Sequence, residues 1–167
     1  MYRKYIFYLR RRVAARIFSP AVQLSAYSDY AIRVLMQTAL CRPRRVTVAE
    51  IAKTFGISRH HLVKVVHDLG RNGYLLTQRG VGGGFVLAQP PEKIKLGDIV
   101  RLGEETDTVI DCREDRDRLC RLRPACRMKR ILDEAAGAFF KVLDHYTLAD
   151  LVRRPGPMRA ALGLENT

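Results

Sequence analysis

The sequence is short of acidic side chains and has no long apolar run. It carries 17 Asp and Glu against 30 Lys and Arg, which leaves a formal net charge of +13 over 167 residues. Such an excess of positive charge favours a polyanionic partner such as nucleic acid. No apolar run approaches the roughly 20 residues of a membrane-spanning helix, and Tyr5–Leu9 is shorter than the apolar core of a secretory signal. We therefore expect a cytoplasmic protein without a membrane span.

Cysteine is also scarce, and its distribution argues against a disulfide framework. Only four cysteines are present, and three of them fall between positions 112 and 126, an odd local number without an export signal. Metal or redox chemistry explains such a group better. A thiol oxidoreductase would need a C-x-x-C motif, which is lacking. Gly80–Gly84 lacks the Gly-Lys-Ser/Thr ending of a nucleotide-binding loop. We expect the protein not to be an enzyme.

The first 22 residues differ from the rest of the chain. They contain six Lys and Arg side chains and no acid. We expect residues 1–22 to be a basic extension, for which two explanations stay open. One is an arm that touches DNA phosphates, and the other is a non-native segment ahead of a valine-coded true start at Val22.

Three amphipathic helices are predicted after the extension. The first has apolar residues at helical spacing, with Ser28 or Ser25 as its N-cap. Thr47 and Glu50 have the spacing of a capping box, which predicts a second helix from about Val48 to a stop at Gly56. A third helix, capped by Ser58, has an apolar face made of Leu62, Val63, Val66 and Leu69. Helix, tight turn and helix form a helix-turn-helix.

Two short strand-like runs follow the third helix. They are Tyr74–Thr77 and Phe85–Ala88, joined by the glycine-rich segment Gln78–Gly84. Glycine allows the positive backbone angles that a hairpin tip needs, so the pattern predicts a wing. The expected fold is therefore mainly α with a small β-hairpin, a winged helix-turn-helix DNA-binding domain followed by a long dimerisation helix.

The third predicted helix is rich in basic and histidine side chains. A helix that lies against phosphates and base edges needs this composition, although a solvated basic face would look the same. The wing favours the first interpretation, because Arg79 sits at a slim hairpin tip that can enter a minor groove. The predicted DNA-binding residues are Ser58, Arg59, His60, His61, Lys64 and Arg79.

Three cysteines occupy a charged segment after the winged domain. Cys112, Cys120 and Cys126 are spaced C-x7-C-x5-C. Thiolates so close in sequence can converge on an iron–sulphur cluster, zinc or a cuprous ion, and the spacing alone does not choose between them. Neighbouring arginines would offset the negative charge of such a centre. Three free thiols stay open as the alternative, whereas Cys41 has apolar neighbours and is expected to be packed.

A long apolar stripe begins after the cysteines. From Arg127, apolar residues recur every three or four positions over about five turns. The stripe needs a partner surface, and a second copy of the chain supplies one, so we expect a homodimer. The expected organisation is a basic extension at 1–22, a DNA-binding domain at 23–102, a cysteine loop at 103–126, a dimerisation helix with a short following helix at 127–152, and a tail at 153–167.

Residues 23–152 resemble the IscR and NsrR group of bacterial winged-helix regulators, and are most similar to its nitric-oxide-sensing NsrR branch. The segments that carry the resemblance are Leu24–Ala31, Ile57–Leu62, Arg79–Leu87, the cysteine triad, and Tyr146–Val152. The resemblance implies a homodimeric repressor on a palindromic operator of double-stranded DNA. It also implies an iron–sulphur cluster, 2Fe-2S or 4Fe-4S, held by Cys112, Cys120 and Cys126, and repression that is lifted by nitric oxide.

Individual positions refine this resemblance. The IscR branch has a histidine ligand three residues after the last cysteine, where this chain has Lys129, which cannot ligate while charged. In some NsrR-like proteins an acidic residue of the other subunit completes the coordination, and the matching residue is Asp29. The gap between Cys112 and Cys120 is longer than in most relatives, which leaves the cluster type open. The alternative function is a related regulator that senses cluster supply, iron or thiol oxidation.

Overall fold

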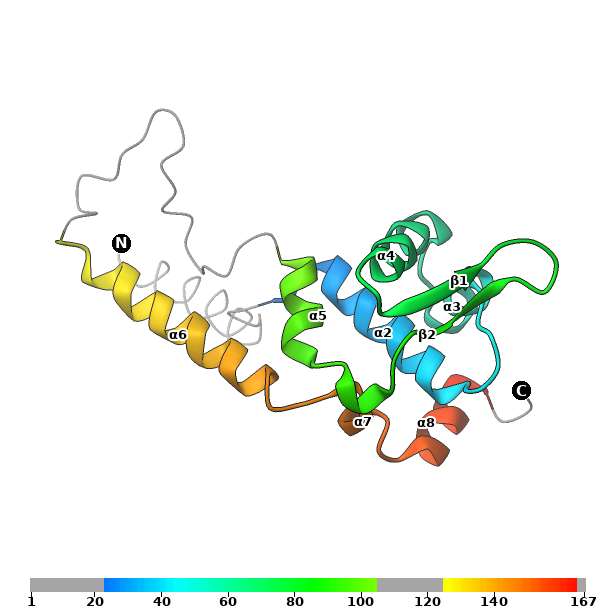
Figure 1. Ribbon diagram of the computed structural model, residues 1–167. Helices are drawn as coiled ribbons and strands as arrows, with labels where there is room; N and C mark the ends of the chain where they lie inside the picture. The colour runs from blue at the N-terminus through cyan, green and yellow to red at the C-terminus, as the bar shows by residue number, and fades with distance from the viewer. Residues whose placement is uncertain (1–22, 105–124, 165–167) are drawn as a thin grey trace, which may run out of the picture.

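The computed structural model describes residues 23–104 and 125–164. Predictions for residues 1–22, Cys112 and Cys120 lie outside these ranges. The described chain is mostly helical with one two-stranded antiparallel sheet, which confirms the predicted fold class (Figure 1). Its winged body comprises helices α2 (Ala26–Leu40), α3 (Val48–Phe55), α4 (Arg59–Arg71) and α5 (Leu96–Gly103), strands β1 (Leu75–Gln78) and β2 (Gly84–Leu87), and the 3-10 helix η1 (Pro91–Lys93).

Helix α2 runs through the middle of this body. The hydroxyl of Ser25 accepts from the backbone N–H of Ser28 at 3.2 Å, so Ser25 is the N-cap, as one of the two predictions had it. Ala31, Val34 and Leu35 are at most 1% exposed. Helices α4 and α5 and strand β2 all pack on α2. Burial of a Val or Leu side chain stabilises the fold by about 1.5–3 kcal/mol, which makes α2 the centre of the core.

The predicted capping box forms at the start of α3. The backbone N–H of Thr47 donates to Glu50 Oε2 at 2.6 Å, and the backbone N–H of Glu50 donates to Thr47 Oγ1 at 3.2 Å. Arg44 Nη1 also donates to Glu50 Oε1 at 2.6 Å. Burial by itself raises the pKa of Glu50, but the hydrogen bonds from Thr47 and Arg44 outweigh it, and the net shift is downward. Gly56 then ends α3 in a left-handed conformation, as predicted.

Two details of the α4 prediction are wrong. Ser58 occupies the N-cap position, but its side chain makes no capping hydrogen bond. Val63 is 57% exposed, and Val65 takes its place in the core at 2%. The reason is the period of the helix, since the buried positions i, i+3, i+4 and i+7 form one stripe. That stripe consists of Leu62, Val65, Val66 and Leu69.

The wing forms with each strand shifted by one residue from the prediction. Leu75 pairs with Leu87, and Gln78 pairs with Gly84 at the far end of the ladder. Tyr74 lies outside β1 because its N–H closes the end of α4 by donating to the carbonyl of Leu69 at 2.9 Å. Gly84 belongs to β2 because it pairs with Gln78. A Cβ at this position would lie 2.6 Å from the carbonyl oxygen of Val46, which pairs with the hairpin base. Only glycine permits this approach.

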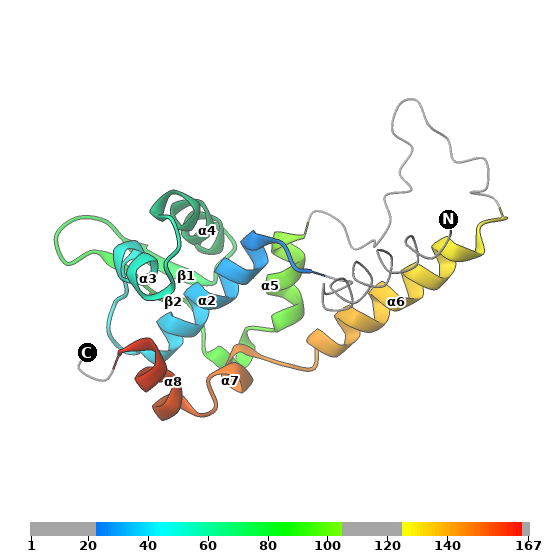
Figure 2. The ribbon, with the colours of Figure 1, turned by 180° about the vertical axis from the view of Figure 1, so that it is seen from behind.

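Helix α6 (Arg127–Leu143) projects from the winged body and is fixed at its C-terminal end (Figures 1 and 2). The guanidinium of Arg101 on α5 donates two hydrogen bonds to Asp144, both at 2.7 Å, and lies 4.7 Å from the ring centre of Phe140. The chain then returns along the body through α7 (Leu148–Leu151) and α8 (Pro155–Leu162). Arg159 of α8 donates to the carbonyl of Leu40 at 2.9 Å.

Most of the apolar stripe of α6 stays uncovered within one chain. Only Ala136 and Phe140 of this helix are buried. Met128, Ile131, Phe139 and Val142 are 38–59% exposed. An apolar strip of this length is unusual on an isolated chain. Within residues 23–104 and 125–164, no helix has the length and apolar character to cross a membrane.

The capping box makes the free energy of unfolding depend on pH in the acid range. Because the folded state lowers the pKa of Glu50, its contribution is present above the unfolded pKa, about 4.3, and is lost as pH falls below it. We expect Glu50→Ala to reduce the free energy of unfolding by about 1 kcal/mol at pH 7, a modest figure because solvent screens this pair.

The measurement is urea unfolding of both proteins at pH 7 and pH 3.5. The difference between them should shrink at the lower pH, whereas Glu92→Ala, an exposed carboxylate on η1, should match the wild type at both. An equal loss at the two pH values would show that the ionised Glu50 carboxylate does not stabilise α3.

Candidate functional site

Helix α4 separates its apolar and basic side chains. Leu62 and Leu69 are fully buried against the body. The opposite side is exposed and carries Arg59, His60, His61, Lys64 and His67. Ser58, just before the helix, is exposed too. The side chains that were predicted to contact DNA are therefore all available to a ligand, on a helix whose other face is anchored in the core.

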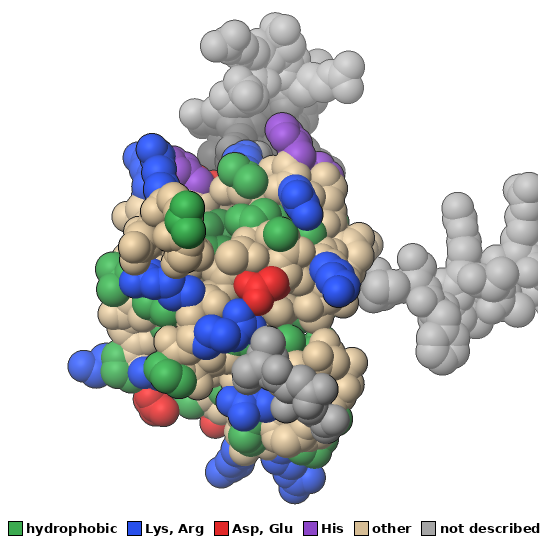
Figure 3. Space-filling model, turned by 90° about the vertical axis from the view of Figure 1, so that its right-hand side faces the viewer, with side chains coloured by type: hydrophobic (Ala, Val, Ile, Leu, Met, Phe, Trp, Pro, Cys, Tyr) green, Lys and Arg blue, Asp and Glu red, His purple; other side chains and the backbone are tan. Residues whose placement is uncertain are grey.

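The hairpin extends beside this helix and is exposed at its tip. Arg79 directly follows β1 and is exposed. Val81, between two glycines of positive φ, is fully exposed, a position that sequence analysis missed because valine is typical of strands and cores. Figure 3 shows the molecule from the wing side, with Lys, Arg and His side chains spread over the surface and few acids among them. Such a surface suits a polyanion.

Two tyrosines of α2 hold α4 in place, and sequence analysis missed both contacts. The Tyr27 hydroxyl donates to Asp68 Oδ2 at 3.3 Å, and the Tyr30 ring stacks on His61 with centroids 6.1 Å apart. Burial, together with the Asp68 carboxylate, raises the pKa of Tyr27 to about 12. The hydroxyl therefore stays a donor at neutral pH. The three-residue spacing of the tyrosines on one helix was the only sequence signal.

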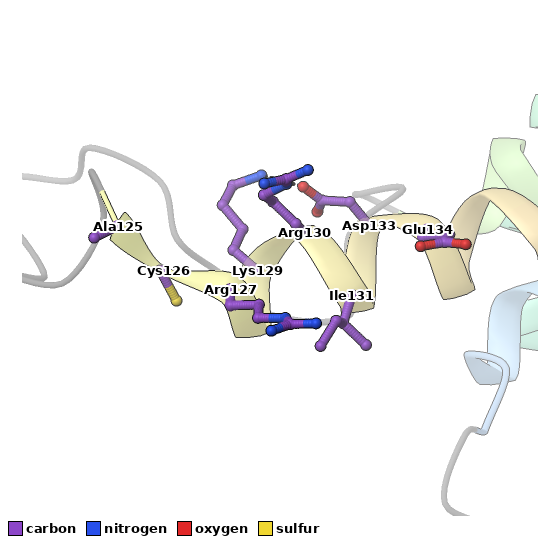
Figure 4. Close-up of a pocket in the computed structure, with 8 residues that line it drawn as sticks. All are labelled: Ala125, Cys126, Arg127, Lys129, Arg130, Ile131, Asp133 and Glu134. Carbon is purple, nitrogen blue, oxygen red and sulfur yellow. Dashed lines mark hydrogen bonds and ion pairs between the residues drawn. The ribbon is translucent and has the colours of Figure 1, made fainter.

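Cys126 is the one predicted cysteine ligand in the described part of the chain. It is the N-cap of α6 and lies partly buried at a hollow (Figure 4). Its side chain, with those of Arg127 and Ile131, points to one side of the helix, and those of Lys129, Arg130 and Asp133 point to the other. The positive end of the helix dipole and the Arg127 guanidinium favour an anionic group at this place. A thiolate or a thiolate-ligated cluster fits that requirement.

Lys129 takes no ligand role in the described structure. Its ammonium pairs with the Asp133 carboxylate one turn later. Residues 23–104 and 125–164 contain no group of three or more His, Cys, Asp or Glu side chains that could hold a metal ion. A centre at Cys126 therefore depends on thiols outside these ranges, which the C-x7-C-x5-C spacing supplies.

Asp29 lies in the first turn of α2 and is not brought to Cys126 of the same chain. Its carboxylate accepts from Arg33 Nε at 2.8 and 2.9 Å, and its side chain is 44% exposed. Asp29 is absent from the residues that line the hollow at Cys126. In both views of the ribbon, the first turn of α6 lies at the far end of the molecule from α2.

Comparison with known proteins places the chain among winged-helix transcriptional regulators. The family model described as "Rrf2: Iron-dependent Transcriptional regulator" matches residues 24–154. The chain is 42% identical to the HTH-type transcriptional regulator NsrR of Bacillus subtilis (strain 168), over 79% of this chain and 91% of that protein. It is also 42% identical to the NsrR of Geobacillus kaustophilus (strain HTA426), over 84% and 97%.

A solved structure extends the likeness to the fold. The structure of CymR, the global cysteine regulator of B. subtilis, superposes with a TM-score of 0.63 at 26% identity, covering 79% of this chain and 97% of that one. The family match, the two NsrR relatives and this shared architecture span the winged body and α6. The chain therefore belongs to the Rrf2 family of transcriptional regulators and is of the NsrR type.

Proposed function

We propose that this protein is a homodimeric repressor that binds a palindromic operator and releases it in response to nitric oxide. The observation that carries the proposal is the α4 helix, which exposes six basic or histidine side chains, Arg71 among them, while its apolar face is packed into the core. A repressor of chromosomal promoters works in the cytoplasm. Occlusion of the promoter by the bound dimer accounts for repression.

In the proposed complex, α4 lies in a major groove. Ser58, Arg59, His60, His61 and Lys64 then face phosphates and base edges, because they share the exposed side of the helix. Arg79 at the wing reaches an adjacent minor groove, where negative potential attracts a guanidinium. A dimer presents two copies of α4 and of the wing, and these fit a palindrome because its half-sites repeat the two-fold symmetry of the protein.

The proposed dimer contact is the exposed stripe of α6. Ile131 and Phe139 sit on it at 53% and 38% exposure, and the helix stands clear of the winged body. Pairing with the same stripe of a second chain removes these side chains from water, which drives association. The same pairing offers a route by which Asp29 of the partner subunit comes close to Cys126, a contact that one chain alone does not make.

The proposed sensor centre is an iron–sulphur cluster held by Cys112, Cys120 and Cys126, with Asp29 of the partner subunit as a further ligand. Cys126 suits the role because α6 begins at this residue and directs its helix dipole toward it. Arg127, which points to the same side of α6 as Cys126, offsets part of the negative charge of the thiolates. A bound cluster supplies iron that reacts with nitric oxide. Arg33 holds the Asp29 carboxylate in place within its own chain.

We expect DNA binding to depend on Lys64 and Arg79. Each side chain replaced by alanine should weaken operator binding about tenfold, and loss of a phosphate contact at Lys64 should lower the salt slope by about 1. Binding isotherms at several salt concentrations measure both quantities. Lys93→Ala, an exposed lysine on η1, is the matched control and should change neither. Unchanged affinity in both variants would contradict the proposed contact of α4 and the wing with DNA.

We expect the cluster to depend on Cys126. Protein purified without oxygen should be coloured, contain iron and sulphide, and lose its absorption bands and DNA affinity when titrated with nitric oxide. Cys126→Ser should be colourless and free of iron, whereas Cys41→Ser, a thiol beside Arg44 in the winged body, should keep the bands. A colourless wild-type protein that contains zinc would contradict the sensor and leave the repressor.

We expect the dimer to depend on the α6 stripe. Phe139→Glu places a carboxylate in the apolar strip and should shift the protein toward monomer by at least about tenfold in the dissociation constant, since burying an unpaired charge costs several kcal/mol. Sedimentation equilibrium measures the shift. Lys141→Glu introduces the same carboxylate at an exposed polar position of α6 and should leave the dimer intact. Equal dissociation constants for the two variants would contradict this interface.

A further inference from the structure

The first turn of α2 contacts two distant parts of the chain at once. On one side it binds Gly103 and Glu104, which directly precede the cysteine segment in the sequence. On the other side it contacts α4 through Tyr27 and Tyr30. A displacement on one side of this turn is therefore transmitted to the other through a single stretch of backbone.

Glu104 is bound to the amino end of α2 by two hydrogen bonds to the same oxygen. The Ser25 backbone N–H donates to Glu104 Oε1 at 2.9 Å, and the Ser28 hydroxyl donates to it at 2.7 Å. The carboxylate also lies at the positive end of the helix dipole, which strengthens the attraction. Ser28 is fully buried, so this acceptor keeps its hydroxyl paired away from water.

Close packing supports these hydrogen bonds. The Ser25 hydroxyl donates to the carbonyl of Gly103 at 3.1 Å. A Cβ on Gly103 would lie 2.3 Å from Ser28 Oγ and 2.7 Å from Tyr27 Cδ1, so a larger residue would push the two segments apart. The end of α5 and the start of α2 therefore form one unit, which includes the tyrosine that reaches α4.

We propose that Glu104 is a positioning residue that couples the state of the cysteine segment to the orientation of α4. The coupling runs from Glu104 to Ser25 and Ser28, through the first turn of α2, and on to Asp68 by way of Tyr27. When the Glu104 carboxylate leaves the amino end of α2, Tyr27 and Tyr30 lose the contacts that position them, and α4 is no longer held for DNA. This inference rests on the proposed function, because it explains how that sensor would act.

The test compares operator affinity in two states of the same protein. The probe is a duplex selected by the wild-type protein from a random-sequence library, and the two states are the protein as purified without oxygen and the same protein treated with a chelator. The quantity of interest is the ratio of the two dissociation constants. A residue with a purely structural role would weaken both states together and leave this ratio unchanged.

We expect Glu104→Ala to bring this ratio at least about fivefold closer to 1. Glu104→Gln should restore most of it, because the amide oxygen can accept both hydrogen bonds. Glu92→Ala, which removes an exposed carboxylate from η1, should keep the wild-type ratio. Tyr27→Phe keeps the packed ring and removes only the hydrogen bond to Asp68. It should therefore also bring the ratio closer to 1, without unfolding the winged body.

A double variant identifies the route. If Glu104 and Asp68 act through one turn of α2, Glu104→Ala combined with Tyr27→Phe should bring the ratio no closer to 1 than the stronger single variant does. Additive losses would overturn the shared route. A wild-type ratio retained in Glu104→Ala and in Tyr27→Phe would overturn the coupling and leave the sensor standing. Equal affinities of the wild type in its two states would overturn the sensor, and the coupling with it.

Discussion

The structure depends on the burial of α2. Ala31 and Val34 of this helix are fully buried, and α4, strand β2 and α5 all pack on it. A close-packed interior transmits small shifts instead of absorbing them. Every surface with a proposed role is therefore supported by one helix, either directly, as for α4 and the wing, or through α5, as for α6.

Polar contacts at the two ends of α2 determine how that support is used. At its amino end, Ser25 and Ser28 bind Glu104 and the neighbouring tyrosines contact α4. At its carboxyl end, Leu40 accepts from Arg159, which fastens α8 to the body. The amino end of α2 therefore contacts both α4 and Glu104, the residue that precedes the cysteine segment. A signal that reaches this end has only one helix turn to cross before it meets α4.

The arrangement of charge follows the same division. The exposed basic side chains of α4 and the wing are carried on rigid elements, which fits recognition of a regular polyanion. Asp68, the one acid on α4, is not presented to solvent as a free carboxylate, because Tyr27 donates to it. At the other end of the molecule, Arg127 lies on the same side of α6 as Cys126, where the thiolate centre is proposed. The two basic regions are thus proposed to bind different anions.

Local order along the chain was readable from the amino acids alone. The Thr47–Glu50 box, the stop at Gly56, the glycine-rich hairpin and the long apolar period after Arg127 each depend on residues a few positions apart, so spacing was enough to predict them. The exposed basic face of α4 followed in the same way. Spacing also predicted that the three cysteines share one role, but did not choose between an iron–sulphur cluster, zinc and a cuprous ion.

Contacts between distant segments were decided only by the tertiary structure. No local pattern pairs Glu104 with Ser28 or Tyr27 with Asp68, because 76 and 41 residues separate the partners. The one-residue shift of β2 depends likewise on Val46, which lies opposite the hairpin base. The exchange of Val63 for Val65, by contrast, follows from the period of the helix, which the sequence already contains. Sequence determined the elements and their chemistry, whereas packing on α2 decided which of them touch, since a side chain's partner depends on the whole fold.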